Sequence, residues 1–152
     1  MKVILQRVTQ ASVKVGDETV GQIGLGAMLL VGVAHDDSSA QADWLAAKIA
    51  SLRIFPAANG PSGFDRTLAE VNGAALVVSQ FTLYGETRKG RRPDFIQAAR
   101  PEHAAPLIDH FAAQLRTHGL PVQMGRFGAD MQVSLVNDGP VTLILEKTSE
   151  AV

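Results

Sequence analysis

The 152-residue sequence contains no cysteine, one tryptophan, one tyrosine and no long apolar run. The absence of cysteine excludes disulfides and thiolate chemistry and is compatible with a reducing compartment. No stretch approaches the roughly 18 apolar residues that cross a bilayer, and the N-terminal segment lacks the apolar run of a signal peptide. The formal net charge of −1 argues against sequence-independent coating of nucleic acid, so any contact with RNA must come from a local patch. We therefore expect a cytoplasmic protein with no membrane partner.

A chain of this length is expected to form one domain over residues 1–152, with about 70% of its unfolded surface buried. Its apolar pattern predicts a mixed α/β fold with two main helices and strands that are mostly antiparallel or mixed. An N-terminal β-hairpin should turn at Gly16-Asp17. The other expected strands cover residues 25–33, 54–55, 74–81, 121–124, 131–136 and 141–146, and the expected helices cover residues 39–53 and 101–118.

Two details of this assignment concern loops and helix ends. Residues 56–63 hold two prolines and two glycines and are expected to form a loop. Pro106 would fall one turn inside a helix that begins at Pro101, so that helix either starts near Pro106 or has a distorted first turn. The tail, residues 147–152, is expected to be frayed.

Several common catalytic signatures are absent. The glycines of residues 21–26 stand in the wrong order for a dinucleotide-binding loop and precede a strand, so we interpret this segment as a turn. There is no P-loop and no Gly-x-Ser-x-Gly elbow. The four histidines lack a metal-ligand spacing. His35 with Asp36 and Asp37 could imitate a metal cluster, but helix capping explains the aspartates more simply. We expect no metal and no other cofactor.

Two short segments interrupt strand-like runs: Ser79-Gln80-Phe81-Thr82-Leu83 and Asn137-Asp138-Gly139-Pro140-Val141-Thr142. Gly-Pro in a strand pattern is costly, because proline cannot donate to the ladder and glycine packs nothing. The hydroxyls of Ser79 and Thr82 have no histidine beside them in the sequence, and they also suit strand ends, where they satisfy nearby backbone groups. The residues themselves therefore indicate a site built from backbone and shape.

Together the two segments resemble the signature motifs of the D-aminoacyl-tRNA deacylase (D-tyrosyl-tRNA deacylase) family, whose members remove D-amino acids esterified to tRNA. The resemblance also includes Gln6-Arg7-Val8, Arg53-Ile54-Phe55, Gly125-Arg126-Phe127, residues 129–133 and Arg92-Pro93. Either motif alone would recur by chance, but both in this order in a chain of this length are specific. The resemblance implies the family's barrel-like fold, no cofactor, and an editing hydrolase that cleaves the carboxylic ester of D-aminoacyl-tRNA.

The resemblance further implies a homodimer with its sites at the subunit interface. In the family the Gly-Pro bond is cis and its loop reaches into the partner's pocket, so Gly139 and Pro140 would direct their carbonyls into the space that an L side chain needs. Arg7 would fix the orientation of this loop, a role suited to a rigid guanidinium. A D side chain points away from the carbonyls and glycine has none. Glycyl-tRNA, including glycine mischarged on tRNA-Ala, is therefore an expected second substrate.

The implied catalytic residues are Ser79, Gln80, Phe81 and Thr82. Aminoacyl esters are already activated, so hydrolysis needs orientation, an attacking water and stabilisation of the oxyanion. The family is thought to use main-chain N–H groups around this motif, with help from the 2′-hydroxyl of the terminal adenosine. This places Ser79, Gln80 and Phe81 at the adenosine and oxyanion site. Thr82 has been the family's candidate nucleophile, but RNA-assisted catalysis leads us to expect that it is positional.

Four cations lie within five residues: Arg88, Lys89, Arg91 and Arg92. They form either a solvated loop or a grip on tRNA phosphates near the acceptor end, and no DNA partner is expected. Two other functions remain open. A non-catalytic nucleic-acid-binding protein could use this patch, although the chain has no aromatic stacking series. A structural dimer without a ligand would leave the cost of Gly139-Pro140 unexplained.

Overall fold

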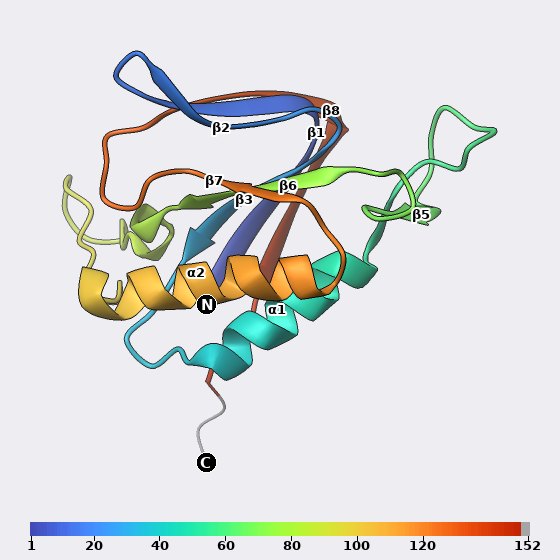
Figure 1. The fold of residues 1–152 in the computed structure, drawn as a ribbon. Helices are drawn as coiled ribbons and strands as arrows, with labels where there is room; N and C mark the ends of the chain where they lie inside the picture. The colour runs from blue at the N-terminus through green and yellow to red at the C-terminus, as the bar shows by residue number, and fades with distance from the viewer. Residues whose placement is uncertain (150–152) are drawn as a thin grey trace.

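A strongly curved six-stranded sheet forms the centre of the computed structural model, which describes residues 1–149 (Figure 1). Its strand order is β2-β1-β3-β6-β7. Residues 2–8 of β1 pair with β3 and residues 11–15 pair with β2, while β8 pairs with β1 over residues 2–14. The strands are β1 (Lys2–Val15), β2 (Glu18–Ile23), β3 (Gly26–Gly32), β6 (Ala74–Ser79), β7 (Val122–Met124) and β8 (Gln132–Glu146). Strand β1 is antiparallel to β2, β3 and β8, whereas β6 is parallel to both β3 and β7.

The curvature brings β2 against β7, so that the sheet is nearly closed. A Cβ atom at Gly21 of β2 would lie 2.7 Å from the carbonyl oxygen of Met124 in β7 and 3.0 Å from Leu76 Cδ1. Only glycine allows two strands to approach this closely. The barrel-like α/β fold expected from the resemblance is therefore confirmed.

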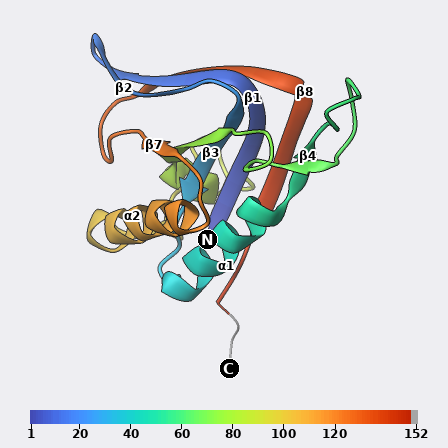
Figure 2. The same ribbon diagram turned by 45° about the vertical axis from the view of Figure 1, so that its right-hand side comes forward.

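Both helices, α1 (Ser39–Ser51) and α2 (Pro101–Thr117), cover the same face of the sheet (Figure 2). Leu29 and Val31 of β3 pack with the buried face of the helices, whereas Met28 packs with Val78 in a second apolar cluster inside the curved sheet. A strand buried on both faces is apolar at successive positions, which explains the continuous apolar run of residues 25–33. The strand and the hairpin turn at Gly16-Asp17 agree with the sequence-based predictions.

The helix boundaries differ slightly from those expected. Helix α1 begins with a capping box between Ser38 and Gln41 and ends at Ser51, so Arg53 belongs to β4 (Arg53–Phe55) and not to the helix. Strand β4 pairs with the short β5 (Arg66–Thr67) across the expected loop. Helix α2 begins at Pro101 and continues through Pro106, which rules out a start near Pro106. No helix within residues 1–149 is long and apolar enough to cross a membrane.

The helix-capping interpretation of Asp36 and Asp37 was wrong. The Asp37 carboxylate is buried, 2.5 Å from the Met1 ammonium, and accepts a hydrogen bond of 2.7 Å from the Ala34 N–H. Asp36 instead accepts from the Ser149 hydroxyl. The main chain of Lys147 exchanges hydrogen bonds with Met1, so residues 147–149 are held and not frayed. The rest of the expected frayed tail, residues 150–152, lies outside the described residues.

The two strands expected at residues 131–136 and 141–146 form one element, β8, which follows β1 along its length (Figure 2). Within β8, Asn137 pairs with Val8 and Thr142 pairs with Gln6. Residues 138–141, the Gly-Pro loop, therefore oppose Arg7 alone and bulge out of the ladder. At the other end of the sheet, β6 stops at Ser79, so the strand expected to reach Phe81 is shorter, and a 3₁₀ helix (η1, Phe81–Tyr84) follows.

Candidate active site

The first motif, residues 79–83, lies where β6 ends and the chain turns into η1. Ser79 pairs with Val31 of β3, and the Gln80 N–H donates a hydrogen bond of 2.8 Å to the Val31 carbonyl. The first N–H groups of a helix have no acceptor within it, so the N–H of Phe81 has none inside η1. The motif thus presents a hydroxyl and main-chain donors at the end of a rigid parallel strand.

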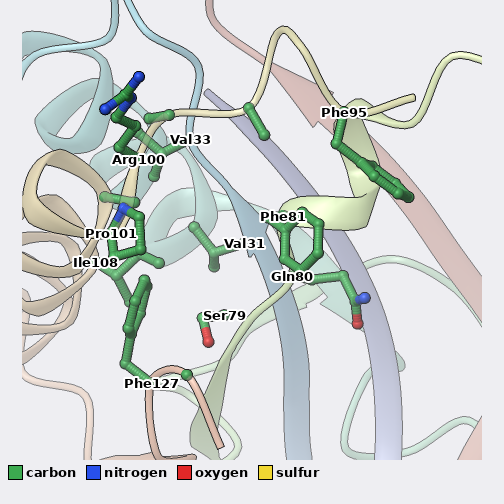
Figure 3. Close-up of a pocket in the computed structure, with 14 residues that line it drawn as sticks. Val31, Val33, Ser79, Gln80, Phe81, Phe95, Arg100, Pro101, Ile108 and Phe127 are labelled. Carbon is green, nitrogen blue, oxygen red and sulfur yellow. The ribbon is translucent and has the colours of Figure 1, made fainter.

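Beside this strand end is a cavity of about 400 Å³ (Figure 3). Its lining comes from β3, the end of β6, the beginning of α2 and the turn after β7, and most of it is apolar. Ser79, Gln80 and Arg100 supply its polar side chains. Ser79 lies between Val31 and Phe127 in the cavity wall (Figure 3), and no hydrogen bond within residues 1–149 engages its hydroxyl. Such a cavity suits an organic ligand that also requires a few polar contacts.

Thr82 does not line this cavity. Its side chain is exposed and its hydroxyl accepts a hydrogen bond from the Gln80 side-chain amide. The motif therefore brings Ser79, Gln80 and Phe81 to the cavity and leaves Thr82 outside it, in contact with Gln80.

Two aromatic residues at the site were not foreseen from the sequence. Phe95 packs edge-on against Phe81, with ring centroids 5.1 Å apart and planes at 74°. Phe127, 40% exposed, closes another side of the cavity from the turn after β7. Both rings come from segments distant from residues 79–83 in the sequence. The resemblance included Gly125-Arg126-Phe127 but gave Phe127 no role, and no local motif marks Phe95. Only the fold brings them together.

The second motif lies elsewhere, against Arg7. Arg7 is 7% exposed, and its guanidinium donates to the Ile54 carbonyl through Nη1 (2.7 Å) and to the Asp138 carbonyl through Nε (3.1 Å). Its Nε also lies 3.3 Å from Asp138 Oδ2. The Gly139–Pro140 peptide bond is cis. Gly139 has φ +125°, and a Cβ atom there would lie 3.0 Å from Arg7 Nη2, so this position requires glycine.

None of Arg7, Gly139 and Pro140 lines the cavity next to Ser79. The two motifs of the chain therefore form two separate surfaces, one a cavity and the other a projecting loop.

The four clustered cations lie on a hairpin, residues 86–94, which we call the basic hairpin. Glu86 and Asp94 exchange main-chain hydrogen bonds of 2.8 and 3.1 Å at its base, and Gly90 at its tip has φ +72°. Arg88 is paired with Glu86 at 2.5 Å, and its hydrogen bonds lower the pKa of Glu86 to about 2. No salt bridge within residues 1–149 involves the remaining cations: Lys89, Arg91 and Arg92. Phe95 follows directly, so the basic hairpin adjoins the cavity.

Three of the four histidines contact main-chain or carboxylate groups: His35 contacts the Ile96 carbonyl (2.7 Å), His103 the Asp37 carbonyl (2.8 Å) and His110 the Asp43 carboxylate (2.6 Å). No group of three or more potential metal ligands occurs within residues 1–149.

Comparison with known proteins decides the family. The profile of the D-Tyr-tRNA(Tyr) deacylase family matches residues 4–146. The chain belongs to this family. A D-aminoacyl-tRNA deacylase of Chloroflexus aurantiacus is 58% identical over 146 residues, covering 96% of this chain and 90% of that protein. One of Exiguobacterium sibiricum is 55% identical over 147 residues and is covered completely. These matches confirm the enzyme class expected from the D-tyrosyl-tRNA deacylase motifs.

Solved structures agree with the deacylase fold. A chain called c-Myc DNA Unwinding Element Binding Protein is 39% identical, has a TM-score of 0.90, and is covered completely by 98% of this chain. A probable eukaryotic D-amino acid tRNA deacylase has a TM-score of 0.82 over 95% of this chain and 97% of its own, at 21% identity, which supports the fold alone.

Proposed function

We propose that this D-tyrosyl-tRNA deacylase family member hydrolyses the ester of D-aminoacyl-tRNA and of glycyl-tRNA, in the cytoplasm where charged tRNA is used, and rejects L-aminoacyl-tRNA. The observation that carries the proposal is the cavity beside Ser79 and Phe81, whose size suits an aminoacyl-adenosine end. The cavity offers shape and main-chain donors but no adjacent nucleophile–base pair. An activated ester needs little more than orientation and stabilisation of the oxyanion.

Within this cavity the terminal adenosine would contact the aromatic groups, and the ester carbonyl would lie at the start of η1. The Gln80 N–H is occupied by Val31, which leaves the Phe81 N–H as the nearer donor to an oxyanion. The 2′-hydroxyl of the adenosine would assist the attacking water. Thr82, outside the cavity and bonded to Gln80, would hold the Gln80 side chain in place.

Selection against L-residues would come from a second copy of the chain. The Gly-Pro loop does not line the cavity of its own chain, so a homodimer in which each loop enters the partner's cavity would complete both sites. The carbonyls of Gly139 and Pro140 would then occupy the space that an L side chain requires. A rigid obstruction can exclude a substrate more strongly than an apolar pocket, which discriminates by only about 1–3 kcal/mol per methylene.

The primary test compares initial hydrolysis rates of D-tyrosyl-tRNA and L-tyrosyl-tRNA by the purified protein, without added metal. Hydrolysis of the D ester alone supports both the deacylase activity and the selection against L-residues. Hydrolysis of both esters supports the hydrolase activity but contradicts the role of Gly139 and Pro140. Binding of D-tyrosyl-tRNA without turnover would favour a nucleic-acid-binding module. Single-stranded DNA added as a competitor would then show whether this chain also binds DNA. The name of one structural relative suggests DNA binding for that relative.

A mixing experiment tests whether the loop acts on the partner. Gly139→Ala is expected to disturb the loop, because φ is +125° and the new methyl group would meet Arg7. Ser79→Phe is expected to fill the cavity while leaving the loop intact. If the loop acts across the dimer, excess Ser79→Phe protein will suppress the L-ester hydrolysis of the Gly139→Ala protein by forming mixed dimers. Unchanged L-ester hydrolysis in verified mixed dimers would contradict action across the interface.

We further propose that the basic hairpin contacts tRNA phosphates. Because Arg88 is engaged by Glu86, three cations remain, and the logarithm of affinity should fall with the logarithm of salt with a slope of about −2 to −3. Replacing Lys89, Arg91 and Arg92 with serine should raise KM, leave kcat unchanged and flatten the slope. Lys14→Ser, an exposed cation on β1, is the matched control. A KM that does not depend on salt in the wild-type protein would contradict the contact.

A further inference from the structure

The base of the Gly-Pro loop is closed by two side chains that flank it. Asn137 donates from Nδ2 to the Thr142 hydroxyl (2.9 Å) and accepts from the Val141 N–H through Oδ1 (3.1 Å). Thr142 also lies 3.4 Å from the side-chain amide of Gln6 on β1. Asn137 is the last residue of β8 that pairs with β1 before the loop, and Thr142 is the first that pairs after it. The hydrogen bond between their side chains therefore closes the base of the loop.

A peptide group is planar, and in a trans bond its C=O and N–H point in opposite directions. The hydrogen bond from the Val141 N–H to Asn137 therefore fixes the direction of the Pro140 carbonyl. On the other side of the loop, the bond from Arg7 to the Asp138 carbonyl fixes the peptide group that precedes Gly139. The two flanking peptide groups, Asp138–Gly139 and Pro140–Val141, are held by different residues, and the Gly139–Pro140 peptide bond lies between them.

Arg7 cannot hold the second peptide group. Within residues 1–149, its hydrogen bonds and ion pair are with the carbonyls of Ile54 and Asp138 and with the Asp138 carboxylate. Residues 138–141 have no ladder partner that could restrain Val141 in its place. Without Asn137, the N–H of Val141 would find water, and the Pro140 carbonyl could rotate with it.

We propose that Asn137 and Thr142 are positioning residues for chiral selection: Asn137 directs the Pro140 carbonyl, and Thr142 holds Asn137. This inference rests on the proposed function of the Gly-Pro loop. Neither Asn137 nor Thr142 lines the cavity next to Ser79. The effect of these two residues on the reaction is therefore exerted through the carbonyl that limits the cavity of the other subunit, and not through contact with the reacting ester.

The test measures initial rates on D-tyrosyl-tRNA and L-tyrosyl-tRNA for four variants at Asn137 and Thr142 and for two comparison variants, Thr19→Val and Arg7→Lys. Asn137→Leu and Thr142→Val keep the volume but remove the polar groups, and should raise the L-to-D rate ratio about tenfold, the effect of one lost hydrogen bond that orients the loop. Asn137→Asp keeps the acceptor for Val141, and Thr142→Ser keeps the hydroxyl, so both should retain the wild-type ratio. Thr19→Val, an exposed threonine on β2, controls for the same change of chemistry elsewhere in the sheet.

The outcomes separate the inference from the function on which it rests. A wild-type ratio in both Asn137→Leu and Thr142→Val, while Arg7→Lys loses selection, overturns the inference and leaves the loop's role intact. A parallel fall of both rates with no change in ratio also overturns it, because selection would then be unaffected. If the wild-type protein itself shows no preference for the D ester, the proposed function fails. Should Asn137→Leu not fold, the comparison of Thr142→Val with Thr142→Ser decides the question.

Discussion

Replacing Arg7 with lysine removes one planar, buried guanidinium and keeps its charge. In the wild-type protein this group donates to the Ile54 carbonyl at 2.7 Å and to the Asp138 carbonyl at 3.1 Å, and it is 7% exposed. A lysine ammonium carries its three N–H donors on one nitrogen and cannot reproduce the two separate donor positions, Nε and Nη1, that Arg7 uses for these acceptors.

The expected loss of stability follows from these contacts. A hydrogen bond from a charged group contributes about 1.5–3 kcal/mol, so Arg7→Lys should lower the free energy of unfolding by about 2 kcal/mol. Arg7→Met removes both bonds and leaves the buried Ile54 carbonyl unpaired, which should cost about 4 kcal/mol. For a domain of this size, 2 kcal/mol corresponds to a fall in Tm of about 4–8 °C.

The assay combines denaturant unfolding with hydrolysis of D- and L-tyrosyl-tRNA at one fixed protein concentration, since the stability of the proposed dimer would depend on concentration. Arg7→Lys should raise the L-ester rate relative to the D-ester rate, because the Asp138–Gly139 peptide group is then held less firmly between β1 and the Ile54 carbonyl. A change in unfolding free energy below about 0.5 kcal/mol, typical of a surface substitution, would refute the energetic reasoning. An unchanged L-to-D ratio in a destabilised variant would refute the role of Arg7 in selection.

Three further predictions concern other parts of the molecule. Thr82→Ala should lower kcat by less than about tenfold, because within residues 1–149 its hydroxyl forms a hydrogen bond with Gln80 alone. A loss of several orders of magnitude, as for a catalytic nucleophile, would contradict this. Gly26→Ala should destabilise the protein by about 3 kcal/mol, because the new Cβ atom would lie 1.9 Å from the Ala74 carbonyl oxygen. Unfolding in denaturant close to that of the wild-type protein would show that β3 and β6 can separate without cost. Burial raises the pKa of Tyr84 well above its usual 10, so the stability it contributes is present below pH 10 and is lost as the pH rises beyond it. As the only tyrosine, it can be followed by phenolate absorbance, and ionisation at pH 10 in the folded protein would contradict its burial.

Local patterns predicted much of the fold. The apolar run that became β3, the turn at Gly16-Asp17 and the two helices follow from periodicity and turn chemistry, which depend on neighbours in the chain. The errors occurred where distant partners intervene. The Asp37 side chain binds the Met1 ammonium and not a helix end, and a partner 36 residues away leaves no local signal.

The continuity of β8 was missed for a related reason. Gly139-Pro140 interrupts the strand pattern locally, and the sequence shows this interruption correctly. Strand β1 is nevertheless long enough to pair with β8 on both sides of the interruption, at Gln6–Thr142 and at Val8–Asn137. The interruption therefore became a bulge within one strand instead of a gap between two.

The sequence by itself determined the family and the residues of both motifs, because short ordered sets of residues are specific even when their partners are unknown. Only the tertiary structure decided what surrounds them. Phe95 and Phe127 reach the cavity from separate segments, Arg7 faces the Gly-Pro loop through the register of β1 and β8, and Thr82 turns away where β6 becomes η1. These relations depend on strand register and side-chain packing between distant segments, which a linear pattern of residues does not contain.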